Sequence, residues 1–343
     1  MFWEILYSVL FLLTGVGVFL VGIVKFSNIL QSGGTERVKK VFEKMGNNRL
    51  VGFGVGAGAT TIIQSSTATT VIIVGLVNAG VMTLAQSTAV IFGANVGTSL
   101  SNMLLSLSAF RVKYFFMAFV FFGALVKILT QHKRANKIAD ILIAFGIIFV
   151  GLEIMSLAFR PDFLGGTYLT NGFESMFEAV QFPLLLILLA FALTAIIQSS
   201  TAATAIFITM AYAGLLDFVA IMYLVFGMRL GTTLTALIAA IPTNRCAKKA
   251  AIMHLLFNLL GTLIFLPIVW PLQHQIAPLF DGIHAVWQIT IFSLILNVAT
   301  AAVLLVFIQP TNKLVNLLVK DKPEQIIIEE LAEDPFQGFT DKF

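Results

Sequence analysis

The sequence contains few charged residues and a single cysteine, and each scarcity excludes a class of protein. Charged residues make up 11% of the 343 residues, whereas soluble domains carry about 25%. The lone Cys246 can form neither an internal disulfide nor a metal–thiolate cluster. The net charge of +4 is spread over short loops, so the basic residues do not indicate a nucleic-acid partner. The glycines from Gly52 to Gly58 follow no predicted strand, so they are not interpreted as a nucleotide-binding loop.

Apolar residues are abundant and occur in long runs. They make up 58% of the chain, and the mean hydropathy is +0.96. Runs of about 20 residues have the length that a helix needs to cross the hydrocarbon core of a bilayer. The apolar segments are 5–30, 50–78, 82–106, 112–130, 138–159, 179–213, 218–240, 250–270 and 286–308. The sequence therefore predicts an all-α polytopic membrane protein.

Two of these segments contain the same polar motif. Residues 64–70 read Gln-Ser-Ser-Thr-Ala-Thr-Thr, and residues 198–204 read Gln-Ser-Ser-Thr-Ala-Ala-Thr. A second matched block follows each copy at the same spacing, Gly-Ala-Asn-Val-Gly-Thr-Ser over 93–99 and Gly-Met-Arg-Leu-Gly-Thr-Thr over 227–233. Duplicated polar breaks in membrane helices are the best pointer in a sequence to the binding site of a transporter.

The first motif divides its apolar segment into two short arms. Each arm of 50–78 has about 14 residues and reaches only about 21 Å as a helix, which is too short to cross a membrane alone. A re-entrant helical hairpin with the motif at its tip fits this length, and a single broken helix is the alternative. Treating 179–213 in the same way leaves about seven full spans and two hairpins.

The basic residues sort the loops onto two sides. Loops 31–49, 131–137 and 242–249 carry eleven Lys and Arg residues, against three in the loops of the opposite side. The positive-inside rule places the first set in the cytoplasm. We therefore expect an external N-terminus and a cytoplasmic C-terminus.

This topology inverts two matching segments. Segment 5–30 runs inward and segment 138–159 runs outward, yet glycine and serine recur between them at a constant offset, as Gly17, Gly22 and Ser27 against Gly146, Gly151 and Ser156. Inverted repeats are the architecture of many secondary transporters. The expected organisation is a first repeat over 1–137, a second over 138–270, a final span over 271–310 and an acidic tail over 311–343, for which a short amphipathic helix or disorder is expected.

The motif residues are suited to binding small ions. Hydroxyl and carbonyl oxygens are ligands for a hard cation such as sodium, and hydroxyls with free N–H groups at broken helix ends suit an oxyanion. Gly93 and Gly97 are expected to allow close backbone approach and local unwinding, with Asn102 one turn further along. The alternative interpretation is that Ser and Thr only mediate close helix packing.

The paired motifs and their downstream blocks resemble the sodium–phosphate cotransporter type II family, and the resemblance extends to about residue 310. It implies sodium-coupled transport of inorganic phosphate, without enzymatic activity, in a bacterial inner membrane. It implies no cofactor apart from Na+ as the coupling ion. The implied partners are phosphate, sodium and the lipid bilayer. The implied binding residues are Gln64, Ser65, Ser66, Thr67, Asn95, Thr98, Ser99, Gln198, Ser199, Ser200, Thr201, Arg229, Thr232 and Thr233, with sodium at Gln64, Ser65, Gln198 and Ser199.

The second block departs from this pattern at Arg229, where the first block has Asn95. A central arginine costs roughly 2.5–3.5 kcal/mol on insertion scales, so it normally faces a polar interior. Three interpretations of Arg229 stay open: its side chain snorkels to the membrane surface, forms a structural pair with Glu153, or lines the binding site. In the third, Arg229 replaces one bound cation or contacts the oxyanion directly. His254 is interpreted as a packing residue or a site residue.

The expected function is secondary active transport of phosphate by alternating access, driven by sodium. Another small oxyanion as substrate, a channel on the same scaffold, and a phosphate-sensing membrane scaffold are the alternatives. Ion-coupled flux that saturates would exclude the channel, and binding without transport would indicate the scaffold.

Overall fold

The computed structural model describes residues 2–44, 48–160, 162–163, 166–179 and 182–320, and this part of the chain forms helices and turns without a strand. The α-helices are α1 (Phe2–Lys44), α2 (Arg49–Ile63), α3 (Ser66–Asn78), α4 (Leu84–Met103), α5 (Val112–Leu129), α6 (Lys133–Leu157), α7 (Gly166–Ala179), α8 (Pro183–Ile197), α9 (Ser200–Tyr212), α10 (Phe218–Gly231), α11 (Thr233–Ala240), α12 (Arg245–Ile276), α13 (Ala285–Val306) and α14 (Ile308–Leu318). Short 3-10 helices η1 (Leu105–Ala109) and η2 (Ala277–Phe280) follow α4 and α12.

Seven helical stretches of the described chain are long and apolar enough to cross a membrane, which confirms the predicted class and number of spans. They are 2–32, 84–109, 112–129, 133–157, 218–240, 245–280 and 285–306. The two motif-containing segments instead form pairs of shorter apolar helices, α2 with α3 and α8 with α9. The re-entrant placement of these pairs stays a prediction, as does the inversion of the repeats.

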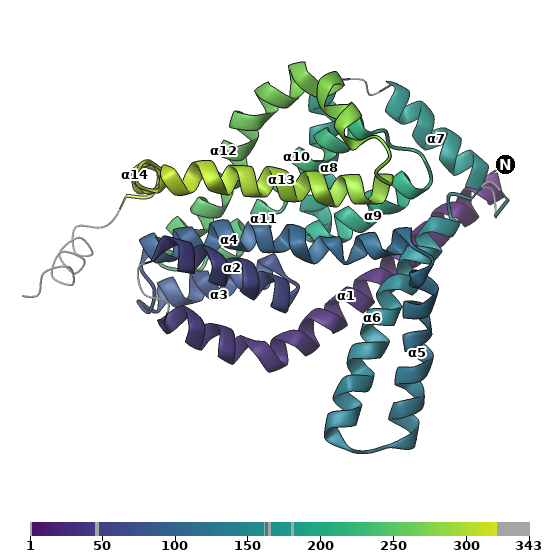
Figure 1. The fold of residues 1–343 in the computed structure, drawn as a ribbon, viewed down its shortest axis with the longest axis horizontal. Coiled ribbons are helices and arrows are strands. Elements are labelled where there is room, and N and C mark those ends of the chain that lie inside the picture. The colour runs from purple at the N-terminus through teal and green to yellow at the C-terminus, as the bar shows by residue number, and fades with distance from the viewer. Residues whose placement is uncertain (1, 45–47, 161, 164–165, 180–181, 321–343) are drawn as a thin grey trace, which may run out of the picture.

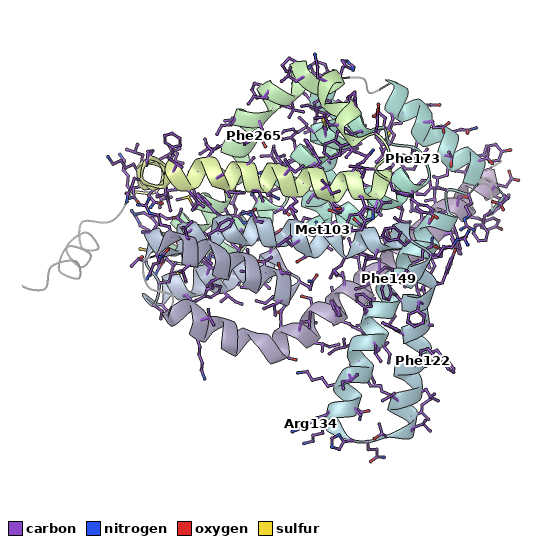
Figure 2. The ribbon with its side chains drawn as sticks, viewed as in Figure 1. Met103, Phe122, Arg134, Phe149, Phe173 and Phe265 are labelled. Atoms are coloured by element: carbon purple, nitrogen blue, oxygen red, sulfur yellow. The ribbon has the colours of Figure 1, made fainter. Side chains whose placement is uncertain are left out.

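Helices α4 and α13 lie side by side through the middle of the molecule, as Figure 1 shows. Helices α1, α2 and α3 lie on one side of them, and α8, α10 and α12 lie on the other. Helices α5 and α6 pack on each other; α6 also packs on α1, and the ends of the pair near the loop between them extend away from the rest as a two-helix arm. Figure 2 shows Arg134 near the tip of this arm and Phe122 further along it.

The glycines of the second blocks bring helices into close contact. A Cβ atom on Gly93 would lie 1.9 Å from the carbonyl oxygen of Phe53, and one on Gly97 would lie 2.4 Å from that of Ala57. The contacts follow the same order along both helices, so α2 and α4 run in the same direction. The expected close approach is therefore present, but the expected unwinding is not, because α4 is continuous through Gly93 and Gly97.

The second repeat has the same arrangement in α8 and α10. A Cβ atom on Gly227 would lie 2.2 Å from the carbonyl oxygen of Ile187, and one on Gly231 would lie 2.7 Å from that of Phe191. These pairs are the counterparts of Gly93 with Phe53 and Gly97 with Ala57, shifted along the chain by the same offset as Gln198 from Gln64. Here the helix is interrupted at the single residue Thr232, between the end of α10 at Gly231 and the start of α11 at Thr233, but the backbone of Thr232 stays in the helical region.

Two predicted segments are longer in the structure. Helix α1 continues beyond residue 30 to Lys44, and α12 begins at Arg245 and ends at Ile276. Pro267 and Pro271 lie within α12 without ending it. Helix α14 covers the start of the predicted tail, and residues 321–343 lie outside the described residues.

Candidate functional site

Each Gln-Ser motif forms a sharp break between two helices. Gln64 ends α2 in the left-handed region, with φ of 58°, and Ser65 is extended and caps α3 by accepting a hydrogen bond from the backbone N–H of Ala68. A left-handed residue ends a helix, and a serine at the cap satisfies a free N–H of the next one. The motif therefore encodes the end of one helix and the start of another.

The second motif repeats this geometry. Gln198 ends α8 with φ of 56°, and Ser199 caps α9 by accepting from the N–H of Ala202. Within the described residues, Gln64 and Gln198 are the two non-glycine residues with positive φ. A left-handed non-glycine backbone costs roughly 1–2 kcal/mol, so both copies keep a strained residue at the same place.

The two breaks meet at one cavity of about 200 Å³. The cavity lies between α1 and the two motifs, and its wall contains hydroxyl and amide groups but no charged side chain. Its lining residues are Ile23, Val24, Ser27, Asn28, Gln31, Gln64, Ser65, Ser66, Ser199, Ser200 and Thr201. Because α3 and α9 both begin here, the positive ends of two helix dipoles border the same space.

The α1 residues in this wall were not predicted as site residues. Ser27 donates a hydrogen bond to the carbonyl oxygen of Ile63 over 3.2 Å and accepts one from Nε2 of Gln31 over 2.7 Å. Ser27 thus ties α1 to the last residue of α2, next to the break. Its recurrence as Ser156 was visible in the sequence, but nothing in α1 alone indicated that this face meets the motifs.

A second, smaller cavity of about 30 Å³ lies deeper, among α4, α9, α10, α12 and α13. It is bordered mainly by amides and hydroxyls, together with the guanidinium of Arg229. Its lining residues are Asn95, Thr98, Asn102, Ser200, Thr204, Val225, Met228, Arg229, Thr232, Asn258, Ser293 and Asn297. Ser200 lines both cavities, so the second motif separates the motif cavity from this deeper one.

A buried hydrogen-bond network joins the two second blocks through α12. Oδ1 of Asn95 lies 3.2 Å from Nε2 of His254 and accepts from Nδ2 of Asn258 over 3.2 Å. Arg229 donates from Nε to Oδ1 of Asn258 over 3.4 Å and from Nη2 to Oγ1 of Thr300 over 3.1 Å. Asn258 therefore bridges the asparagine of one repeat and the arginine of the other.

Further polar contacts connect α4 to α9 and α13. Nδ2 of Asn297 donates to Oγ of Ser99 over 2.7 Å, and Ser99 lies 3.0 Å from Oγ of Ser293. Nδ2 of Asn102 donates to Oγ1 of Thr204 over 3.2 Å. The α12 and α13 members of this network carry no repeated motif, which is why most of them were not predicted from the sequence.

Three of the predicted binding residues whose side chains the structure describes line neither cavity. Gln198 is exposed, and Ser99 and Thr233 are buried outside the two linings. The side chain of Thr67 lies outside the described residues. The predicted sodium set is likewise divided, since Gln64, Ser65 and Ser199 line the motif cavity and Gln198 does not.

Two interpretations of Arg229 do not hold in this structure. Arg229 is only 6% exposed, so it does not snorkel to the surface. Its suggested partner Glu153 pairs instead with Lys113, whose Nζ lies 2.6 Å from Oε2, and with Arg160 at 3.3 Å. The pairing with Glu153 was wrong because α6 carries this carboxylate toward the start of α5, away from α10.

A larger cavity, of about 720 Å³, lies elsewhere, among α7, α8, α10 and the end of α12. Its wall includes Glu174, Asp217, Tyr223 and Trp270, and none of the motif residues. Tyr223 donates a hydrogen bond to Oε1 of Gln273 there. We place the candidate site at the smaller motif cavity, because only there do both repeats contribute the same backbone break.

Comparison with known proteins gives one family. The family model described as Na+/Pi-cotransporter matches residues 18–157 and 169–316. An Escherichia coli K12 protein named "Putative inorganic phosphate export protein YjbB" is 29% identical over 289 residues, which are 84% of this chain and 51% of that protein. The chain thus spans about half the length of that relative. No solved structure gives a significant match.

Two further relatives differ in coverage. "Uncharacterized protein YqeW" of Bacillus subtilis is 29% identical over 269 residues, which are 77% of this chain and 82% of that protein. The human "Sodium-dependent phosphate transport protein 2B" is 36% identical over 61 residues, which are 18% of this chain and 9% of that protein.

Proposed function

Because the chain belongs to the Na+/Pi-cotransporter family, we propose that it is a secondary active transporter that couples sodium to the movement of inorganic phosphate. The family is one of transporters and not of enzymes. Phosphate as the transported ion agrees with the names of the Escherichia coli and human relatives, and sodium coupling agrees with the name of the human one. We place the protein in the bacterial inner membrane, with its N-terminus outside and its C-terminus in the cytoplasm.

The motif cavity carries this proposal. Two helix N-termini border it from two repeats, and such termini bind phosphate through free N–H groups and the helix dipole. The hydroxyls of Ser65, Ser66, Ser199, Ser200 and Thr201 add neutral donors and acceptors. A neutral wall allows an anion to enter together with its cation without an opposing fixed charge. We propose that phosphate binds here and that sodium uses the adjoining carbonyl and hydroxyl oxygens.

The contact between α1 and α6 supports inverted repeats. A Cβ atom on Gly22 would lie 2.8 Å from the backbone N of Ile148, and one on Gly151 would lie 2.5 Å from that of Phe19. In the alignment of the two segments, Gly151 is the counterpart of Gly22 and Ile148 is the counterpart of Phe19. The counterparts of one contacting pair therefore form the other contacting pair, which is the reciprocity of a two-fold interface.

The two repeats differ in how open they are. Ile23, Val24 and Ser27 of α1 line the motif cavity of about 200 Å³. Their counterparts in α6, Leu152, Glu153 and Ser156, line a space of only about 10 Å³ that the Lys113–Glu153 pair fills. We propose that this conformation is open on the side of α1 residues 23–31 and closed on the side of the ion pair, as alternating access requires.

The test is flux of radiolabelled phosphate in proteoliposomes containing the purified protein, with sodium or choline gradients imposed in either direction. We expect saturable flux that follows the sodium gradient and is competed by unlabelled phosphate. Flux that is equal in choline would remove the coupling. Stronger competition by sulfate or arsenate than by unlabelled phosphate would identify that oxyanion as the substrate. The relative named as an export protein makes outward flux the direction to measure first.

A further inference from the structure

Asn95 and Arg229 occupy equivalent places in the two repeats. Asn95 lies between Gly93 and Gly97, which pack on α2, and Arg229 lies between Gly227 and Gly231, which pack on α8 in the same way. Both side chains reach Asn258 of α12. The glycine packing on either side of the two positions is thus the same, and one position carries a charge that the other lacks.

Arg229 is a buried cation without a carboxylate partner. It is 6% exposed, and within the described chain no ion pair includes it. Its Nε and Nη2 donate to neutral oxygens of Asn258 and Thr300, and its guanidinium lies 5.7 Å from the ring centre of Phe257. Its buried Nη1 has no hydrogen-bond partner. A buried charge in this state is costly unless a ligand of opposite charge completes its surroundings.

The atoms around the guanidinium are those that a sodium ion would use. The amide oxygen of Asn258 and the hydroxyl of Thr300 are hard neutral ligands, and the deeper cavity beside them carries further amides and hydroxyls. In the first repeat, Oδ1 of Asn95 lies 3.2 Å from Nε2 of His254 and accepts from Nδ2 of Asn258, so the position equivalent to Arg229 carries no charge of its own.

We propose that Arg229 is a resident cation of the second repeat, which takes the place of one coupling sodium ion and compensates the charge of phosphate bound beside Ser200. This inference rests on the proposed function. The guanidinium cannot leave with the substrate, so each transport cycle would carry one sodium ion fewer than a version with asparagine at this place. The first repeat, with Asn95, would keep its sodium requirement.

The test is to replace Arg229 of the second repeat by asparagine, the residue at the equivalent position of the first repeat. Arg229→Asn and Arg229→Lys are reconstituted beside the wild type, and phosphate flux is measured against sodium concentration. For Arg229→Asn we expect a Hill coefficient for sodium higher by about one. We also expect an apparent phosphate affinity at low sodium that falls by roughly tenfold or more, the size of one close charge contact. Arg229→Lys should follow the wild type. Arg134→Asn, on the exposed arm, is the matched loss of an arginine and should change nothing.

A binding measurement that does not require transport is needed in case a variant binds its ions but does not transport them. The thermal unfolding midpoint of each purified protein is compared in sodium chloride and choline chloride, with and without phosphate. In sodium chloride, Arg229→Asn should show a larger rise in the midpoint than the wild type and Arg229→Lys, because it binds one sodium ion more. Arg229→Asn with unchanged sodium dependence and phosphate affinity overturns the proposal, as does an inactive Arg229→Asn that shows no added sodium stabilisation. Absence of phosphate flux from the wild type would refute the proposed function separately, because the sodium shift of Arg229→Asn can be read without it.

Discussion

Among single residues, the glutamines at the two breaks hold a backbone conformation that glycine adopts more easily. Gln64 and Gln198 have φ of 58° and 56°, where a non-glycine residue costs roughly 1–2 kcal/mol. We predict that Gln64→Gly keeps the thermal unfolding midpoint near that of the wild type, because relief of this strain offsets the greater chain entropy of glycine. We predict that phosphate flux falls strongly, because the amide that lines the motif cavity is lost.

Gln64→Ala separates the two contributions. Alanine removes the same amide but keeps a Cβ atom in the left-handed region, so this variant should lose flux to the same extent and be less stable than Gln64→Gly. Thermal unfolding in detergent and flux in proteoliposomes measure the two effects. Wild-type flux in Gln64→Gly would mean that the glutamine has only a conformational role.

Among the residues of the candidate site, those in a repeated motif could be predicted from the sequence, and few of the remaining site residues could. Ser65, Ser66, Ser199, Ser200 and Thr201 were predicted from the motif, and all five line the motif cavity. Gln198 was predicted from the same pattern but is exposed, because repetition in sequence does not require the two copies to face the cavity alike. Nothing local indicated the contribution of α1, since its side chains reach the motifs only through the packing of α1 on α2 and α9.

Among helices, the contact of α2 with α4 depends on glycine at particular positions. A Cβ atom on Gly93 would lie 1.9 Å from the backbone oxygen of Phe53, whereas one on Gly54 would meet no atom within 4 Å. We predict that Gly93→Ala lowers the free energy of unfolding by about 1–3 kcal/mol, the usual cost of overpacking. The added methyl group should push α2 away from α4, and this displacement should also reduce phosphate flux.

Gly54→Ala is the matched control, because it makes the same substitution in a helix of the same contact. It should be neutral or stabilise by up to about 1 kcal/mol, since alanine favours a helix over glycine. Unfolding by heat in detergent measures both variants. Equal stability of Gly93→Ala and Gly54→Ala would contradict the close contact of these helices.

The sequence predicted where helices break better than where they continue. The length of the apolar run over 50–78 required a break, and the polar motif supplied its place at Gln64. Unwinding at Gly93 and Gly97 was a wrong expectation, because the need for glycine there comes from the backbone of α2 and not from α4 itself. The continuation of α12 beyond residue 270, through Pro271, was likewise not predicted, since neighbouring helices can support a proline within a membrane helix.

At the scale of the whole molecule, the ion pair of Lys113 with Glu153 fills the small space in α6 whose lining residues are the counterparts of those of α1 in the motif cavity. Both side chains are buried, their charged atoms lie 2.6 Å apart, and Lys113 also lies 4.7 Å from the ring centre of Tyr212 in α9. Glu153→Gln would leave Lys113 buried without its full partner, at a cost of roughly 3–5 kcal/mol in this conformation. If the closed side can open, this cost shifts the population toward the opposite conformation by more than about a hundredfold.

Two cysteine reporters distinguish this shift from unfolding. In a Cys246→Ser background, Asn28→Cys reports the open side, and Leu157→Cys, at the counterpart position in α6, reports its mirror place. With a membrane-impermeant maleimide, Glu153→Gln should slow labelling of Asn28→Cys from the side that we propose to be cytoplasmic and speed labelling of Leu157→Cys from the opposite side. The exchanged pair, Lys113→Glu with Glu153→Lys, should restore the wild-type rates. Faster labelling at both positions would indicate loss of structure, and no change at either would show that this ion pair does not control access to the site.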